Sequence, residues 1–202
     1  MNNPFPPELR TMAVVPRWAI LRTSMQQSVA EHSYFVMMYS MMVAKTIKWK
    51  GPLDYLMFNA GMHDNDETVS GDIVGTVRSV ILDKEATEEF LSAKTEERMG
   101  GLIHAYYEME DGVPDALIKE ADRIVKAADV LEATLFLIDN VKMGNQMMGP
   151  ALEGGKRSLE AAWRALPADK EFLDKTWQTI VLPSIAEHYE RGGRGVAPGV
   201  YI

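Results

Sequence analysis

The stretch SVAEHSYFVMMYSMMVAKTIKW spans residues 28–49 and is apolar nearly all round when it is wound into a helix. Ser28 and Glu31 have the spacing of a capping box, which predicts that the helix begins at Val29. The pair Gly51-Pro52 ends it. A helix without a polar face has to be surrounded by other elements, so this stretch predicts the central buried helix of a helical domain.

The segments on both sides also carry helical signals, such as proline near a first turn and apolar residues three or four apart. The pattern predicts short helical segments over 6–12 and 18–27, and helices over 53–63, 84–107, 114–143, 156–166 and 169–190, the last bent or interrupted at Pro183. Residues 149–155 read as a loop, and the tail RGGRGVAPGVYI reads as irregular. No alternating strand pattern or internal repeat is present. We therefore predict one all-α domain over 1–202.

The composition limits the classes of function that fit this chain. It has 202 residues, of which 47% are hydrophobic, enough to fill the core of one domain. The net charge is −8 without any basic patch, so a nucleic-acid polymer is not an expected partner. The absence of cysteine excludes disulfides and thiolate chemistry. Neither a signal peptide nor an apolar run of membrane-spanning length is present, so we expect no membrane partner and a cytoplasmic location.

The stretch GMHDNDETVSGD, residues 61–72, places one histidine among several acids directly after an apolar helix. Unpaired carboxylates are costly in a core, so these acids need partners. A single histidine is most simply explained by a hydrogen bond to a neighbour. His32 and His63 together weaken that explanation, because each has an acid beside it in an apolar helix. Imidazoles and carboxylates are the usual nitrogen and oxygen ligands of divalent metals, so His32, His63 and Asp64 can supply three ligands.

A fourth ligand should come from a later helix, and the segment 119–133 offers two acids. Asp122 and Asp129 are seven residues apart and fall on nearly one helical face. Lys119 and Lys126 have the spacing to pair with Asp122. Asp129 has apolar neighbours instead, so its carboxylate should be buried and a metal would satisfy it.

The order His…His-Asp…Asp resembles that of the HD-domain phosphohydrolases. Within that family the chain is most similar to the 5′-deoxynucleotidase branch, whose relatives include phage deoxyadenosine-triphosphate triphosphohydrolases. The resemblance covers about residues 14–145 and leaves 150–202 unmatched. Its motifs are RWAILR at 17–22, VAEHS at 29–33, HDNDETVSGD at 63–72 and VKAADVLEA at 125–133, followed by Gly144-Asn145. It implies a helical HD domain with a mononuclear metal site.

The resemblance assigns the metal ligands and the catalytic group. His32, His63, Asp64 and Asp129 match the ligands of one divalent transition-metal ion, such as Co, Mn or Zn, with Mg as a further option. Glu67 takes the place of the catalytic acid or base. The match selects Asp129 over Asp122, in agreement with the burial argument.

Further positions match the family's substrate contacts. Asp72 matches an acid that binds substrate or supports the metal ligands, and Trp18 matches a ring beside the sugar. Ile20 lies where it can limit which base fits. Arg17, Arg22 and Arg78 match cations that face the phosphate, although the family carries lysine at the place of Arg78. Without the family, the arginines would read as surface cations and Trp18 as a core aromatic residue.

The resemblance implies a metal-dependent phosphohydrolase of 2′-deoxynucleotides, located in the host cytoplasm if a phage encodes it. Two reactions remain open. The favoured one releases a deoxynucleoside from a deoxynucleoside 5′-monophosphate, and the other releases tripolyphosphate from a deoxynucleoside triphosphate. A remote alternative is a helical protein that binds metal or nucleotide without catalysis. The family also implies a homo-oligomer, in which methionine-rich helices serve either the core or an interface.

Overall fold

The computed structural model of the protein describes residues 6–19, 21–72 and 84–191. These residues form helices and no β-strand, apart from one isolated antiparallel bridge between Pro16 and Ser28. The all-α prediction is therefore confirmed. The α-helices are α1 Val29–Thr46, α2 Leu53–Met62, α3 Glu67–Ser70, α5 Lys84–Glu110, α6 Asp115–Lys142, α7 Gly149–Arg164, α8 Lys170–Thr176 and α9 Leu182–Arg191. Two 3₁₀ segments, Pro7–Ala13 and Gln146–Met148, and a π-helical segment, Trp177–Val181, complete the described elements.

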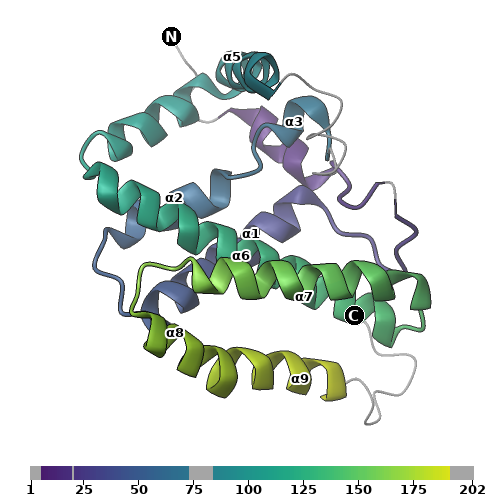
Figure 1. The fold of residues 1–202 in the computed structure, drawn as a ribbon. Coiled ribbons are helices and arrows are strands. Elements are labelled where there is room, and N and C mark those ends of the chain that lie inside the picture. The colour runs from purple at the N-terminus through teal and green to yellow at the C-terminus, as the bar shows by residue number, and fades with distance from the viewer. Residues whose placement is uncertain (1–5, 20, 73–83, 192–202) are drawn as a thin grey trace.

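Helix α6 is the centre of the molecule and packs on both α1 and α7. Figure 1 shows α6 and α7 side by side across the middle, with α8 and α9 beyond α7 and α5 at the opposite end. Ile124, Ala128 and Ile138 on α6 are fully buried, and they belong to one core cluster with Val36 on α1 and Leu159 on α7. This sustained apolar stripe confirms the helix predicted over 114–143.

Helix α1 begins at Val29, as the capping box predicted. The Ser28 hydroxyl accepts from the Glu31 N–H at 3.2 Å, and the Glu31 carboxylate accepts from the Ser28 N–H at 2.7 Å. Burial of α1 on every side was predicted and is wrong, because no element of the described residues packs over one of its faces. That face leaves four large apolar side chains exposed, namely Tyr34, Phe35, Met38 and Met42.

The helical segment predicted over 18–27 is also wrong. The chain there forms a loop that is closed by backbone hydrogen bonds, from Arg17 N–H to the Gln27 carbonyl at 2.8 Å and from Val29 N–H to the Val15 carbonyl at 3.0 Å. Trp18 has a φ of 61°, which a regular helix does not permit. Contacts between distant residues therefore override the local helical pattern.

Residues 149–155 were predicted to be a loop, and they form the first turns of α7 instead. Pro150 stands in the first turn, where its missing N–H costs nothing. A Cβ atom at Gly155 would lie 3.1 Å from the Thr134 hydroxyl of α6. The glycine therefore allows a close approach of the two helices, and it does not mark a turn.

Two long helices contain irregular points. Helix α5 runs to Glu110 and is kinked at Met99, whose φ and ψ are −119° and 21°. The interruption predicted at Pro183 falls just before it, in the π-helical segment Trp177–Val181. The part of the tail over 192–202 lies outside the described residues. Within the described ranges, no helix combines the length and hydrophobicity needed to cross a membrane.

Candidate metal centre

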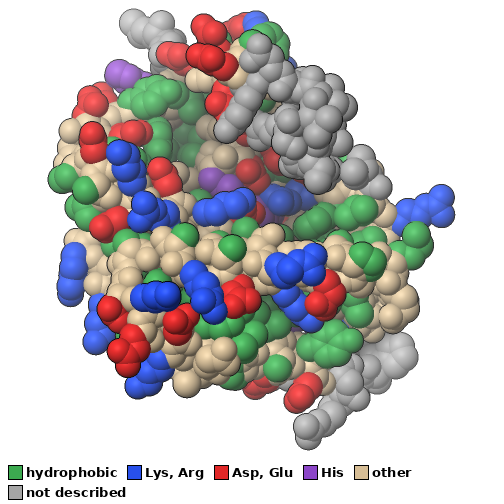
Figure 2. Space-filling model, in the orientation of Figure 1, with side chains coloured by type: hydrophobic (Ala, Val, Ile, Leu, Met, Phe, Trp, Pro, Cys, Tyr) green, Lys and Arg blue, Asp and Glu red, His purple; other side chains and the backbone are tan. Residues whose placement is uncertain are grey.

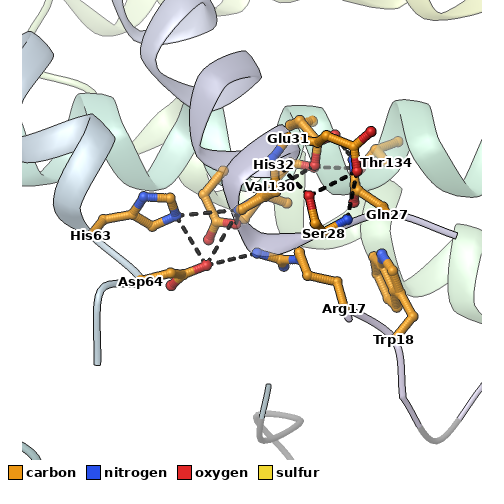
Figure 3. Close-up of polar contacts among 12 residues, drawn as sticks. Arg17, Trp18, Gln27, Ser28, Glu31, His32, His63, Asp64, Val130 and Thr134 are labelled. Atoms are coloured by element: carbon orange, nitrogen blue, oxygen red, sulfur yellow. Dashed lines mark hydrogen bonds and ion pairs between the residues drawn. The ribbon is translucent and has the colours of Figure 1, made fainter. Parts of the chain in front are cut away.

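The donor atoms of His32, His63 and Asp129 form one cluster, and the Asp64 carboxylate lies against the two imidazoles of that cluster. His32 comes from α1, His63 and Asp64 from the end of α2, and Asp129 from the middle of α6. The His32 Nε2 atom lies 3.2 Å from His63 Nε2, 3.5 Å from Asp64 Oδ2 and 3.4 Å from Asp129 Oδ1. The His63 Nε2 atom lies 3.3 Å from Asp64 Oδ2. Figure 3 shows His63 and Asp64 pointing toward one another and toward Arg17.

These distances fit a metal ion. Nitrogen and oxygen ligands at ~2.0–2.2 Å from a zinc-like ion in tetrahedral geometry are ~3.3–3.6 Å from one another. The donor atoms of His32, His63 and Asp129 all lie within 4.8 Å of each other. The set combines imidazole and carboxylate without sulfur, which suits Co, Mn and Zn and admits Mg less readily.

Both imidazoles are anchored through Nδ1, which leaves Nε2 directed at the centre. His63 Nδ1 lies 2.7 Å from the Ala60 carbonyl. His32 Nδ1 lies 2.5 Å from a carboxylate oxygen of Glu132, and the Gln27 side chain donates to the other oxygen at 2.6 Å. Glu132 and Gln27 were not among the site residues predicted from the sequence. The available signal was that Glu132 follows Asp129 by three residues, which places both on one face of α6.

The two acids of the centre are held ionised by positive neighbours. Burial raises the pKa of Asp64, but protonated His63 and Arg17 outweigh it and lower this pKa to about 2. The Arg17 guanidinium donates to Asp64 at 2.7 Å. Burial likewise raises the pKa of Asp129, and hydrogen bonding to His32 with the charge of Lys126 moves it well below its usual range. Positively charged side chains thus offset the two carboxylates, a task that a divalent ion in this site would take over.

The expected pairing of Lys126 with Asp122 is not what the structure shows. Lys126 contacts Asp129 at 2.8 Å, and Asp122 accepts a hydrogen bond from the Asn59 side chain at 3.0 Å. Asp122 lies outside the cluster of donor atoms, which agrees with the choice of Asp129.

Glu67 is the first residue of α3 and is buried, with 6% of its surface exposed. Its Oε2 atom has no hydrogen-bond partner within the described parts of the chain. Burial, reinforced by the negative charge of Asp64, raises the pKa of Glu67 to about 8. The carboxyl group is therefore suited to carry a proton at neutral pH beside the metal centre.

The loop before α1 brings two predicted substrate residues to this centre. Arg17 contacts Asp64, and its Nε atom is buried without a partner among the described residues. The backbone N–H of Trp18 donates to Asp72 at 2.6 Å, and its ring stacks on Phe136 with centroids 5.7 Å apart. The Trp18 ring thus has a packing role, and its contact with a sugar stays a prediction.

The remaining predicted residues are less defined. The Arg22 side chain is exposed, while its carbonyl accepts from the Asn145 side chain at 2.6 Å. Ile20 and Arg78 lie outside the described residues. His104 and His188 pair with single acids, Glu108 at 3.3 Å and Asp139 at 2.9 Å, as expected for structural histidines.

A pocket of about 530 Å³ opens beside His63 between α2 and α5. Figure 2 shows this face hollowed, with histidine and acidic side chains visible inside the hollow. Its lining includes Asn59, Asn65 and Thr95 together with the ring of Tyr106. A second depression, of about 310 Å³, reaches His63, Asp64 and Asp129 directly. A ligand of nucleotide size therefore has access to the centre.

A helical bundle whose His, His-Asp and Asp side chains meet between three helices belongs to the HD-domain class of metal-dependent phosphohydrolases. The comparison with family models gives the branch. The family described as 5′-deoxynucleotidase YfbR-like matches residues 4–180 of the chain, so the chain is a member of that family.

Curated relatives agree with this membership. A 5′-deoxynucleotidase from Vibrio atlanticus is 27% identical over 161 residues, which cover 75% of this chain and 80% of the relative. A 5′-deoxynucleotidase from Vibrio parahaemolyticus is 26% identical over 176 residues, covering 82% and 88%. The 5′-deoxynucleotidase YfbR of Salmonella typhi is 27% identical over 161 residues, covering 75% and 80%. The resemblance seen in the sequence is thereby confirmed, and the non-catalytic alternative loses its basis.

Proposed function

We propose that the protein hydrolyses 2′-deoxynucleoside 5′-monophosphates to a deoxynucleoside and inorganic phosphate, using one divalent metal ion. The observation that carries this proposal is the convergence of donor atoms from His32, His63, Asp64 and Asp129, 3.2–3.5 Å from one another where they are in contact. The activity that names the family and the relatives, 5′-deoxynucleotidase, supports the substrate class.

The protein's own groups divide the work of binding and proton transfer. When bound, the divalent ion polarises the phosphoryl group and lowers the pKa of the attacking water. Arg17 lies against Asp64 through one of its five N–H donors, so the guanidinium can also donate to a phosphoryl oxygen beside that carboxylate. Arg22 and Arg78 remain proposed phosphate contacts, and Asp72 supports the loop that carries Trp18.

Glu67 is the proposed proton donor. Cleavage of the bond between phosphorus and the 5′ oxygen leaves negative charge on that oxygen. A carboxyl group with a pKa of about 8 is protonated at neutral pH and can give its proton to the departing oxygen. Once Glu67 has given its proton to the leaving oxygen, its carboxylate takes up the proton that the attacking water releases, so the reaction consumes one water and restores the acid in each cycle.

The decisive experiment compares dAMP with dATP. After reconstitution with Co²⁺, Mn²⁺, Zn²⁺ or Mg²⁺ in turn, we expect inorganic phosphate and deoxyadenosine from dAMP. Tripolyphosphate from dATP, with dAMP left intact, would overturn the proposal in favour of the triphosphate reaction. The Asp129→Ala protein, prepared in parallel, reveals any contaminating phosphatase.

We also propose that the protein is a homo-oligomer. The support is the row of exposed apolar side chains on α1, where Tyr34, Phe35 and Met42 are 55%, 44% and 62% exposed. A contiguous apolar surface of this kind is uncommon on a monomer. Light scattering of the purified protein gives the subunit number, and a monomer mass at micromolar concentration would contradict the proposal.

A further inference from the structure

We infer that Glu132 is a positioning residue of the metal centre, and that Gln27 and Glu132 together hold His32 with its Nε2 atom toward the other ligands. The inference rests on the proposed metal site. It adds two side chains to which the sequence motifs gave no role, and it links the metal centre to the loop before α1.

The contacts form an uninterrupted buried chain. The Gln27 amide donates to Glu132 Oε1 at 2.6 Å, and Glu132 Oε2 lies 2.5 Å from His32 Nδ1. The three residues are 7%, 4% and 0% exposed, in the order Gln27, Glu132 and His32. Both carboxylate oxygens of Glu132 are therefore used, and each by a partner on a different element.

The chemistry of the partners fixes the orientation of the imidazole. An ionised carboxylate only accepts hydrogen bonds, so the Nδ1 atom of His32 has to donate. The lone pair available to a metal is then the one on Nε2, which lies among the atoms of His63, Asp64 and Asp129. Without Glu132, the ring would lose both its preferred tautomer and the contact that stops it from rotating.

Gln27 connects this arrangement to a predicted phosphate contact. Its backbone carbonyl accepts from the N–H of Arg17 at 2.8 Å, so the same residue closes the loop and supports Glu132. The Oε1 atom of Gln27 is buried without a partner among the described residues. If the Gln27 amide flips, its oxygen can therefore accept a hydrogen bond from the new side-chain amide of the variant Glu132→Gln.

The experiment measures metal affinity and the His32 tautomer, both without reference to turnover. Glu132→Met keeps the volume of the side chain and removes the acceptor. We expect it to weaken Co²⁺ or Zn²⁺ binding by ~10–100-fold in a competition titration, the range known for such supporting groups. Glu132→Gln keeps an acceptor and should lose less than ~10-fold, with Nδ1 of His32 still protonated in ¹⁵N NMR spectra of the metal-free protein.

The matched control is Asp139→Asn. Asp139 is also an acid of α6 that contacts an imidazole, that of His188 at 2.9 Å, but it lies outside the metal cluster. We expect it to leave metal affinity unchanged. Gln27→Ala removes the hydrogen bond to Glu132 while it leaves Glu132 and all four proposed ligands unchanged in sequence. It should weaken metal binding by several-fold.

The failure of this inference can be told apart from the failure of the proposed site. If His32→Ala loses the metal while Glu132→Met and Gln27→Ala bind it like the wild type, the positioning role is wrong and the site stands. If His32→Ala itself binds metal normally, the ligand assignment is wrong. Should Glu132→Met not fold, unchanged affinity in Gln27→Ala overturns the inference.

Discussion

Glu67 combines a buried carboxyl oxygen that has no partner among the described residues with a second acid, Asp64, close enough to raise its pKa. As a proton donor, Glu67 should be needed for hydrolysis but not for binding of the metal or the nucleotide. We expect Glu67→Ala to retain metal and dAMP while turnover falls by roughly 10²–10⁴, the usual range for a general acid. Isothermal titration and a phosphate assay separate the two quantities. Near-normal turnover would remove Glu67 from the mechanism.

The same carboxyl group should also shape the pH dependence of folding in the metal-free protein. The pKa of Glu67 is 4.5 as a reference value and about 8 in the fold, so the folded state keeps its proton longer than the unfolded state. Its contribution to stability is therefore fully present below pH 4.5 and is lost as the pH rises to about 8.

Glu67→Gln removes this dependence, since the amide does not titrate. In urea unfolding with a chelator present, the variant should gain stability relative to the wild type between pH 5 and pH 8, by a few kcal/mol at most, and the gain should level off above pH 8. If the stability difference between Glu67→Gln and the wild type stays constant over this pH range, burial does not raise the pKa of Glu67.

The ring of Trp18 stacks on Phe136 and is half-buried, so part of it remains free to contact a substrate. If its exposed edge lies against the ribose 2′ carbon, a hydroxyl there meets both a clash and an unpaired polar contact. One overpacked contact costs about 1–3 kcal/mol, or roughly 5- to 150-fold in kcat/KM. We expect dAMP to be preferred over AMP, and Trp18→Ala to narrow the gap by raising AMP turnover.

Equal kcat/KM for dAMP and AMP in the wild type would contradict the assignment of this ring. Far-ultraviolet circular dichroism of Trp18→Ala provides the necessary control. A variant that unfolds would show that the stack on Phe136 is the main task of the side chain.

Which residues could be foreseen depends on how local their signal is. Asp129 was identifiable because apolar neighbours predict burial of its carboxylate, and the structure leaves its side chain only 19% exposed. Glu132 could not be assigned in this way. Its function arises from a contact with His32, one hundred residues earlier in the chain, and no local pattern marks that contact.

At the scale of elements, the loop over 14–28 is the part of the site that depends most on tertiary contacts. Its closing hydrogen bonds and the bridge between Pro16 and Ser28 join the two ends of the loop, and the Ser24 N–H donates to Asn140 of α6, 116 residues further along the chain. The helical pattern of WAILRTSMQQ is local, and the sum of these contacts exceeds the weak propensity that it represents. In α7 the reverse occurred: its glycines predicted a loop, but the segment is helical, and Gly155 allows close packing against Thr134.

Asn140 offers a test of how this loop is held. Its side chain is fully buried, accepts from the Ser24 N–H at 2.6 Å and donates to the Phe136 carbonyl at 2.9 Å. Asn140→Ala leaves the Ser24 N–H without its partner, which costs about 1–3 kcal/mol. We expect a lower free energy of unfolding and a raised KM for dAMP, with metal affinity nearly unchanged.

Asn59→Ala is the control for that variant, because its bond to Asp122 is exposed and lies away from the loop. Its free energy of unfolding should lie within about 0.5 kcal/mol of the wild-type value. If Asn140→Ala unfolds more readily but keeps the wild-type KM, Asn140 supports the core alone and does not order the substrate loop.

At the scale of the whole molecule, the proposed metal ion is a cross-link between three elements that are far apart in the sequence. His32 belongs to α1, His63 and Asp64 to the end of α2, and Asp129 to α6. An ion that binds only the folded state stabilises it by about 2.7 kcal/mol at a concentration one hundred times its Kd. For a chain of 202 residues this corresponds to a Tm increase of roughly 5–11 °C.

Chelation should therefore lower the Tm of the purified protein by that amount, and readdition of Co²⁺, Mn²⁺ or Zn²⁺ should restore it. Asp129→Ala should melt at one temperature with or without metal, because the variant lacks a ligand. Asp122→Ala should keep the shift, since its carboxylate bonds Asn59 outside the cluster. A shift that disappears in Asp122→Ala and persists in Asp129→Ala would reverse the assignment of the fourth ligand. An unchanged Tm after complete metal removal, verified by elemental analysis, would show that the three helices hold the centre together without the ion.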